Sequence, residues 1–457
     1  MSQNTAETLG AFAARLRFED LPEKVVATAR LGIVDCTGVA IAGSGEAPGK
    51  LAAEFVAAQS GGQGPCTLIG NAGVKAPSAL AALANGASAH AMDYDDVNWS
   101  LIGHPSASLV PCLYALGEER HASGKQMVTA YIVGLEVMAR FGQSCQPKHS
   151  LDNFWHPTST IGAIGCAAAS ANLLGLSASQ AAHALAAAAS MSDGLVRNFG
   201  TMVKPLHAGL AAQHGLTAAS LAGAGFVANT GVFDVPGGFH DAFCKGLDCK
   251  RDRLLTIDDF FDAEQTGLTI KPYPCGVASH PAIDAMFELV AEHRISAEDV
   301  ESGEVGVTRY TYGKLFYDSP ETELQGKFSM AYPIVRVLLD GRVGLSAFTE
   351  EAVNDASARD LVARFGMHVD EEIEANWKGG SRPCRVTLQL RDGRTVSKLV
   401  EKSKGDPSRP LSWGEIQAKF MDCATQTFDA DHAGELLRRL ESIGDAADVG
   451  DITKLLV

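Results

Sequence analysis

Apolar residues recur at helical spacing through most of the first 265 residues. A stripe of this kind begins after Pro22-Glu23, and proline in the first turn is typical of a helix start. Ser123 and Ser177 stand where helix caps are expected. The segment 227–246 is rich in glycine and is predicted to be a loop. The other predicted helices cover 76–90, 106–118, 124–141, 159–174, 178–192 and 206–224.

The pattern changes near Thr269. Residues 304–312 and 384–390 alternate between apolar and polar side chains, as strands do. The pair Asp392-Gly393 separates the second run from a third at 395–400, which predicts a β-hairpin. Helical patterns lie before, between and after these strands, over 281–291, 328–340 and 412–440.

These patterns predict a mainly α protein in two parts. Residues 1–268 and 411–457 would form one large helical domain, made by both ends of the chain. Residues 269–410 would form a smaller inserted α+β lid domain. A crevice between two such domains is a natural place for a small-molecule site.

Composition narrows the functional classes. The formal net charge is −16, and no basic stripe offsets it, so nucleic-acid binding is not expected. The first 16 residues have neither the basic nor the apolar region of a signal peptide. No run of 18 apolar residues lacks polar breaks, so we expect no membrane span and a cytoplasmic protein.

Ten cysteines are scattered along the chain without a CxxC motif. In a chain of this kind they are expected to be reduced, buried and small apolar residues. The closest pair, Cys244 and Cys249, lacks the spacing of a zinc or iron–sulfur site. We therefore predict no metal site.

Two segments gather histidines and acids beside prolines. The first contains His90, Asp93 and His104, the last of these before a proline. The second contains His156 and Ser159 at the start of a helix rich in glycine and alanine. A helix N-terminus offers free N–H groups for a carboxylate. Ordinary helix capping is the alternative for both segments.

Three further segments place cations or tyrosines among glycines and prolines. The segment 198–207 contains Lys204 and His207, although a lysine before a helix is usually solvated. Lys271 and Tyr273 stand in KPYP at the predicted domain boundary, where a rigid linker is the alternative. Tyr332 lies in KFSMAY, which an ordinary helix start also explains. Imidazoles and ammonium groups near loops suit proton transfer beside an anion.

Familiar nucleotide and hydrolase motifs are missing from the sequence. There is no GxSxG elbow, no P-loop and no GxGxxG turn after a strand. ATP, nicotinamide and serine-hydrolase chemistry therefore have no support, and we expect no cofactor.

The chain resembles the MmgE/PrpD family over nearly its whole length. The matching stretches keep the family's order and rough spacing: AHAMDYDD (89–96), GHPSASLVP (103–111), WHPTSTIGAIG (155–165), NFGTMVKPLHAGLAAQHG (198–215), KPYP (271–274), SHPAID (279–284) and KFSMAYPIVRVLLDG (327–341). The family includes methylcitrate dehydratases, cis-aconitate decarboxylases and an iminodisuccinate epimerase. The resemblance implies a helical domain with a smaller lid, a homodimer and no metal requirement.

The resemblance also implies a set of site residues. It points to Asp93, His104, His156, Lys204 and Tyr332 as the catalytic set. Lys271 belongs to the same active-site set, and we assign it to substrate binding with Tyr273, His207 and Ser159. Asp93 is expected to orient a histidine, and His156 or His104 to act as base and acid partners.

Two positions depart from the decarboxylase pattern of the family. Decarboxylase members carry a histidine where this chain has Gly276, and a threonine where it has Val97. The predicted function is therefore a cofactor-independent lyase of propionate metabolism, removing a proton next to a carboxylate as a 2-methylcitrate-like dehydratase. An epimerase of an iminodisuccinate-like acid, a cis-aconitate-type decarboxylase and a non-catalytic binding protein are the alternatives.

Overall fold

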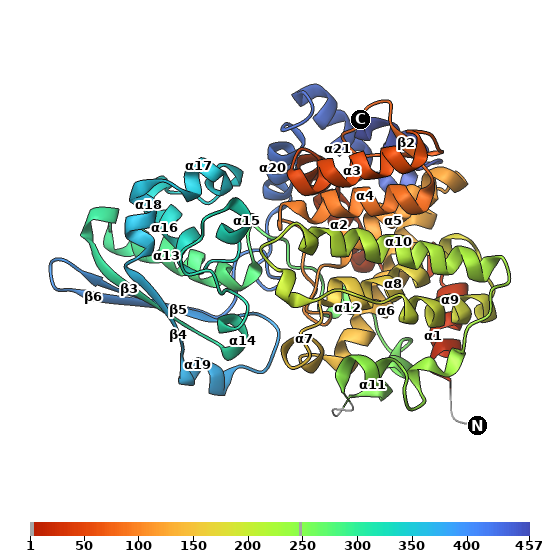
Figure 1. Cartoon of the computed structure of the whole chain (residues 1–457), viewed down its shortest axis with the longest axis horizontal. Helices are drawn as coiled ribbons and strands as arrows, with labels where there is room; N and C mark the ends of the chain where they lie inside the picture. The colour runs from red at the N-terminus through yellow and green to blue at the C-terminus, as the bar shows by residue number, and fades with distance from the viewer. Residues whose placement is uncertain (1–3, 246–248) are drawn as a thin grey trace. The chain divides into compact units, whose positions relative to one another are not determined.

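The computed structural model describes residues 4–245 and 249–457. These residues form two compact units (Figure 1). Unit 1 contains the chain as far as Asn198, then residues 202–269 and 412–457, and unit 2 contains 199–201 and 270–411. The mainly α fold class with a smaller α+β part is confirmed.

Unit 1 is built from helices and one very short sheet. Its helices are α1 (Thr5–Arg15), α2 (Glu23–Ser44), α3 (Ala47–Ser60), α4 (Ser78–Ala91), α5 (Pro105–Arg120), α6 (Gly124–Cys145), α7 (Lys148–Leu151), α8 (Pro157–Leu173), α9 (Ala178–Ser190), α10 (Val203–Gly223), α11 (Phe239–Cys244), α12 (Asp262–Gln265), α20 (Trp413–Ala424), α21 (Ala430–Glu441) and α22 (Gly450–Thr453). The sheet pairs β1 (Cys66–Thr67) with β2 (Lys75–Ala76).

Unit 2 contains a four-stranded sheet in the order β4-β3-β5-β6. Its strands are β3 (Val300–Val307), β4 (Phe365–Val369), β5 (Cys384–Leu390) and β6 (Thr395–Val400). β3 pairs parallel with β4, and the other two pairings are antiparallel. The helices are α13 (His280–His293), α14 (Arg309–Tyr312), α15 (Glu323–Gly326), α16 (Ala331–Asp340), α17 (Glu350–Val353), α18 (Ala356–Val362) and α19 (Glu371–Asn376).

The hairpin and two helix caps are as predicted. β5 and β6 pair antiparallel on either side of Asp392-Gly393, and β5 alternates between buried and half-buried residues. Ser123 and Ser177 both cap their helices, each in a capping box with a glutamine three residues later. Strong local signals therefore placed these elements correctly.

Three predictions about elements were wrong in detail. The strand predicted over 304–312 ends at Val307, because Thr308 caps α14 by accepting from the Thr311 N–H. The segment 227–246, which was expected to be a loop, contains the helix α11. Residue 246, the last residue of this predicted loop, lies outside the described ranges. The predicted tail helix over 412–440 is two helices, α20 and α21.

Among the residues that the structure describes, one helix is long and apolar enough to meet the criteria for a membrane span. This helix is α2, and 72% of its most apolar window is buried inside the structure. Burial of this kind is typical of a core helix, so α2 is weak evidence for a membrane protein.

Two glycines let α4 and α10 approach each other closely. A Cβ atom on Gly209 would lie 2.2 Å from the Leu83 carbonyl oxygen, and one on Gly86 would lie 2.6 Å from the Gly209 Cα. Only residues without a side chain fit such a crossing. The C-terminal end of α4 is thereby held beside the N-terminal end of α10.

Candidate active site

Three helices of unit 1 begin at one cluster of reactive side chains. His104 is the N-cap of α5, His156 is the N-cap of α8, and Lys204 lies in the first turn of α10. The His104 backbone N–H donates to Thr158 Oγ1 at 3.0 Å, which ties the starts of α5 and α8 together. Thr158 and Ser159 are therefore not the cap that the alternative reading expected.

The α4–α10 crossing adds His90 to this cluster. His90 lies in the last turn of α4, and its Nε2 is 2.8 Å from Lys204 Nζ. The same ammonium group contacts Asp93 Oδ1 at 2.5 Å. Asp93 adopts a left-handed backbone conformation with φ of 49°, which is uncommon for a residue other than glycine and is often found at functional sites.

Asp95 is a carboxylate that contacts two histidines of the cluster. Both carboxylate oxygens of Asp95 lie 2.9 Å from His90 Nδ1, and Oδ2 lies 3.1 Å from His104 Nδ1. The Asp93 carboxylate pairs with Lys204 through Oδ1, and its expected role in orienting a histidine stays a prediction. Asp95 is buried.

The contacts of His104 fix its neutral tautomer. Its Nδ1 lies 2.9 Å from the Asp96 carbonyl oxygen, and a carbonyl can only accept a hydrogen bond. The proton must therefore be on Nδ1, which leaves the lone pair on Nε2. A neutral imidazole with this orientation is suited to accept a proton from a substrate.

His156 pairs with a second histidine. Its Nδ1 is 3.1 Å from Nδ1 of His207, so one ring donates and the other accepts. The ring centroids of His156 and His104 are 6.4 Å apart. Ser159 donates to Asp193 and to the His207 carbonyl oxygen, so its hydroxyl is engaged within the protein.

Burial keeps the inner histidines neutral. Desolvation, aided by the Lys204 charge, lowers the pKa of His90 to about 3 despite the opposing effect of Asp95. Burial also lowers the pKa of His207 to about 4. The pKa of His156 lies well below its usual range, first because of burial and then because of the neighbouring His207 and Lys204.

The two acids beside His104 are shifted in opposite directions. Burial acts to raise the pKa of Asp95, but His90 and His104 hold it well below its usual range. Burial raises the pKa of Asp96 to about 8, although hydrogen bonds from Ser106 oppose the shift. One buried carboxylate therefore stays ionised next to a neighbour that favours its neutral form.

The cluster can attract an anion even though the chain is acidic. The N-termini of α5, α8 and α10 carry positive partial charge, and Lys204 adds an ammonium group at the same place. Dipoles and a cation that are already in position stabilise negative charge without reorganising. The arrangement is suited to a carboxylate substrate whose charge increases during proton removal.

The same residues include a set with metal-ligand geometry. Ligand atoms of His90, Asp93, Asp95 and His104 lie within 4.8 Å of one another. Lys204 Nζ, however, contacts both His90 Nε2 and Asp93 Oδ1. An ammonium group therefore already occupies the position from which a metal ion would bind these two residues, and the set does not fit a metal ion as it stands.

The remaining predicted residues belong to unit 2. Lys271 is buried, and its segment begins where Ile270 donates to the Gly405 carbonyl at 3.0 Å. The Tyr273 hydroxyl donates to Asp284 at 2.6 Å. The Tyr332 hydroxyl donates to the Ala347 carbonyl oxygen in the core of unit 2. Both hydroxyls have partners within unit 2, so their contacts give the expected roles in catalysis and substrate binding no support.

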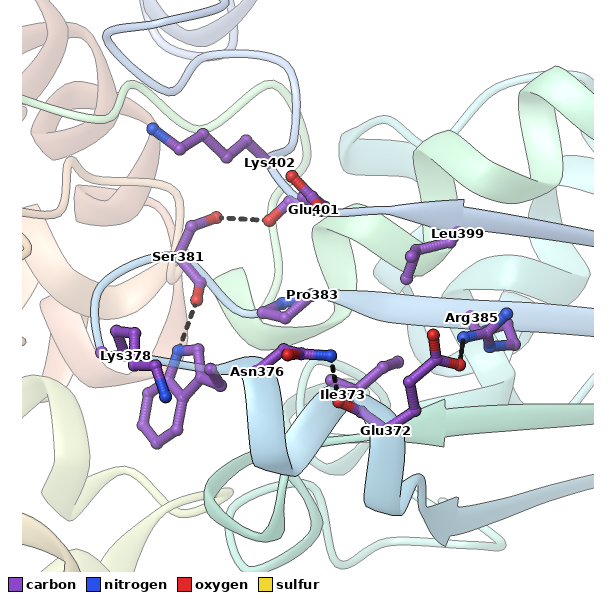
Figure 2. Close-up of a pocket in the computed structure, with 12 residues that line it drawn as sticks. Glu372, Ile373, Asn376, Lys378, Ser381, Pro383, Arg385, Leu399, Glu401 and Lys402 are labelled. Atoms are coloured by element: carbon purple, nitrogen blue, oxygen red, sulfur yellow. Dashed lines mark hydrogen bonds and ion pairs between the residues drawn. The ribbon is translucent and has the colours of Figure 1, made fainter.

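Unit 2 also has a pocket of about 410 Å³ outside the predicted set (Figure 2). It lies beside α19, the start of β5 and the end of β6, where Arg385 pairs with Glu372 and Ser381 donates to the Glu401 carbonyl. Neither a histidine nor a predicted site residue lines this pocket. It therefore lacks the proton-transfer groups found in unit 1.

Sequence reasoning did not select His90, Asp95 or Asp193 as site residues. His90 and Asp95 stand in the same eight-residue stretch as Asp93. The sequence therefore pointed to this stretch as part of the site, but not to these two residues individually. Which of its acids faces which histidine depends on the turn after α4. Asp193 stands in an unremarkable SDG sequence, and its role depends on packing against Ser159.

The fold and the cluster together suit an enzyme that transfers a proton beside an anion. The MmgE/PrpD N-terminal domain matches residues 7–252, and the MmgE/PrpD C-terminal domain matches residues 273–442. The chain therefore belongs to the MmgE/PrpD family.

Several curated relatives are similar over nearly their whole length. The cis-aconitate decarboxylase of Mus musculus is 27% identical, covering 100% of this chain and 94% of the relative. That of Homo sapiens is 26% identical, covering 100% and 95%. That of Aspergillus terreus is 27% identical, covering 97% and 94%. These relatives are lyase-type enzymes, which at this coarse level supports a lyase.

Proposed function

We propose that this protein is a cofactor-independent lyase that removes a proton next to a carboxylate of a small polycarboxylic acid. The observation that carries the proposal is the cluster in which Asp95 orients His104 while Lys204 stands beside it. A base and a cation at one place are what removal of a weakly acidic C–H proton requires.

His104 is the base in this proposal. Its Nε2 takes the proton from the carbon next to the carboxylate, and Asp95 and the Asp96 carbonyl hold its Nδ1–H. Lys204 and the three helix N-termini stabilise the enediolate-like charge that develops. This assignment separates the two histidines that the sequence left equivalent.

His156 acts on the leaving group. If His207 donates from its Nδ1, then His156 accepts at Nδ1 and carries its own proton on Nε2. A neutral imidazole can then donate a hydrogen bond to a departing hydroxyl, which leaves as water. In this step the C–H and C–O bonds break, a C=C bond forms, and the departing hydroxide takes up the proton that His104 abstracted, so that water is released and both histidines end neutral.

We propose 2-methylcitrate-like acids as substrates and dehydration as the reaction. Val97 is buried and apolar where decarboxylases of the family carry a threonine, and its backbone pairs with Thr269. Gly276 has no side chain where they carry a histidine. Decarboxylation of a cis-aconitate-type acid is the second candidate, because the curated relatives named above are cis-aconitate decarboxylases.

The test is turnover in heavy water with citrate-like acids, cis-aconitate and iminodicarboxylates. Loss of water, followed by NMR, supports dehydration, and release of carbon dioxide supports decarboxylation. Deuterium incorporation with inverted configuration and no loss identifies an epimerase. Absence of both exchange and turnover over the whole panel contradicts the proposal.

We also propose that the protein is a cytoplasmic homodimer, as the family resemblance implies. Native mass spectrometry should give roughly twice the 48.0 kDa chain mass. A monomer at micromolar concentration would contradict the expected assembly.

A further inference from the structure

Three thiols and an imidazole gather at a second place in unit 1. Cys145, His149 and Cys244 are buried, and one ligand atom of each lies within 4.8 Å of the others. The Cys249 thiol interacts with the Cys244 thiol, which also interacts with Cys145 and His149. None of these four residues belongs to the histidine–lysine cluster described above.

Separate segments bring these four residues together. Cys145 is the last residue of α6, and His149 follows in the short helix α7. Cys244 is the last residue of α11. The Lys250 N–H donates to the Ser144 carbonyl at 2.8 Å, which ties the residue after Cys249 to the end of α6. The gathering is thus fixed by backbone hydrogen bonds as well as by side chains.

The tautomer of His149 is set by its neighbour Thr160. His149 Nε2 lies 2.7 Å from Thr160 Oγ1, and that hydroxyl donates its own proton to the His156 carbonyl at 3.2 Å. His149 must therefore donate from Nε2 and keep its lone pair on Nδ1. Nδ1 is buried and makes no conventional hydrogen bond among the described residues.

We propose that Cys145, His149, Cys244 and Cys249 bind a structural Zn²⁺ ion. Three thiolates and one imidazole form a known closed zinc ligand set, with atoms roughly 3.5–4 Å apart around the metal. The separations among Cys145, His149 and Cys244 need only a small contraction, and Cys249, whose thiol interacts with that of Cys244, would complete the set by moving towards the other two ligands. The sequence prediction against a metal site considered only the C-x4-C pair Cys244 and Cys249. The fold brings this pair beside the C-x3-H pair Cys145 and His149, and the two pairs together supply four zinc ligands.

Charge and outer contacts fit this assignment. Three thiolates and one Zn²⁺ leave one negative charge, and the positive charges of Lys148 and Arg251 act on Cys249. Ligating histidines usually donate their other N–H to an oxygen that orients the ring, as His149 does to Thr160. Metal binding would also fix the residues before α8, because Trp155 N–H donates to the His149 carbonyl at 3.2 Å.

The direct test is metal content of untagged protein purified after expression with zinc. Mass spectrometry of the metal should give about one zinc per chain, falling at least tenfold in Cys244→Ser. Cys112→Ser, which alters another buried cysteine of unit 1, should keep its zinc. Zinc-free wild-type protein, or equal zinc in Cys244→Ser and wild type, would overturn the proposal.

A second variant tests the geometry without removing a ligand. Thr160→Val keeps all four ligands but removes the hydroxyl that orients His149, so zinc affinity in chelator competition should fall about 10- to 100-fold. Unchanged affinity, or a Cys145–Cys244 disulfide in protein isolated without reductant, would contradict the zinc site. Because metal is measured directly, the result does not depend on the proposed reaction.

Discussion

At the scale of single residues, the site depends on which atom faces which partner. His104 and His156 both precede a proline and both cap a helix, so the sequence could not distinguish their roles. The structure does so through Nδ1, which faces a carbonyl and a carboxylate in His104 and another imidazole in His156.

Removing the base should separate chemistry from folding. In His104→Gln we expect kcat to fall about 10²- to 10⁴-fold, the usual contribution of a general base, with an unchanged circular dichroism spectrum. His121→Gln is the matched control, because His121 is exposed and pairs with Asp448. Deuterium exchange at the wild-type rate in His104→Gln would refute the assignment of the base.

Acid should destabilise the protein through its buried histidines. His207 titrates at about 4 in the folded protein, below its ordinary value of 6.5. The unfolded chain therefore binds more protons between these pH values, and stability falls as pH falls, by up to about 1.4 kcal/mol per pH unit for this residue. Urea unfolding between pH 6.5 and 4.5 should show a shallower fall in His207→Asn than in wild type. Equal slopes for the two proteins would contradict the buried neutral state.

At the scale of elements, the residues at which helices begin could be predicted from the sequence, but the elements that pack against one another could not. Ser123 and Ser177 cap as expected because a capping box is a local interaction. β4 was not predicted, since its five residues pair parallel with β3 across a long stretch of chain. The placement of His90 beside Lys204 likewise depends on the α4–α10 crossing, which no local pattern encodes.

Widening the α4–α10 crossing should disturb both stability and activity. Gly209→Ala places a Cβ against the Leu83 carbonyl, and overpacking of this kind typically costs about 1–3 kcal/mol. We also expect a lower kcat, because the helices must separate near His90 and Lys204. Gly434→Ala in α21 is the control, since its new Cβ meets no atom within 4 Å. Thermal unfolding and kcat check both effects, and a Gly209→Ala enzyme equal to the control would contradict the argument.

At the scale of the whole molecule, the C-terminal segment returns to unit 1 and is held by a buried ion pair. Lys419 in α20 lies 2.6 Å from Asp35 in α2 and donates to the Tyr94 carbonyl at 2.8 Å. The sequence pattern suggested that both chain ends share one helical domain, but it could not indicate this pairing, which joins residues 384 positions apart. Long-range pairs of this kind leave no trace in periodicity.

Removing Lys419 should loosen this junction. Lys419→Met leaves the Asp35 carboxylate buried without its cation, a change that typically costs about 3–5 kcal/mol. The double variant Asp35→Asn/Lys419→Met should recover most of that loss, because neither member of the buried pair is then charged. Chemical denaturation measures both proteins. A double variant no more stable than Lys419→Met would show that the ion pair is not the source of the effect.

The close contact of Gly86 with Gly209 has a consequence for how such a protein can diversify. At this point the backbones of α4 and α10 are in direct contact. The distance between the two helices is therefore set by the dimensions of the peptide backbone, which are the same for all amino acids. Side chains elsewhere in the interior can change size over evolutionary time while that separation stays the same. In the proposed enzyme, a fixed distance between these two helices would leave other segments free to change and to accept new substrates.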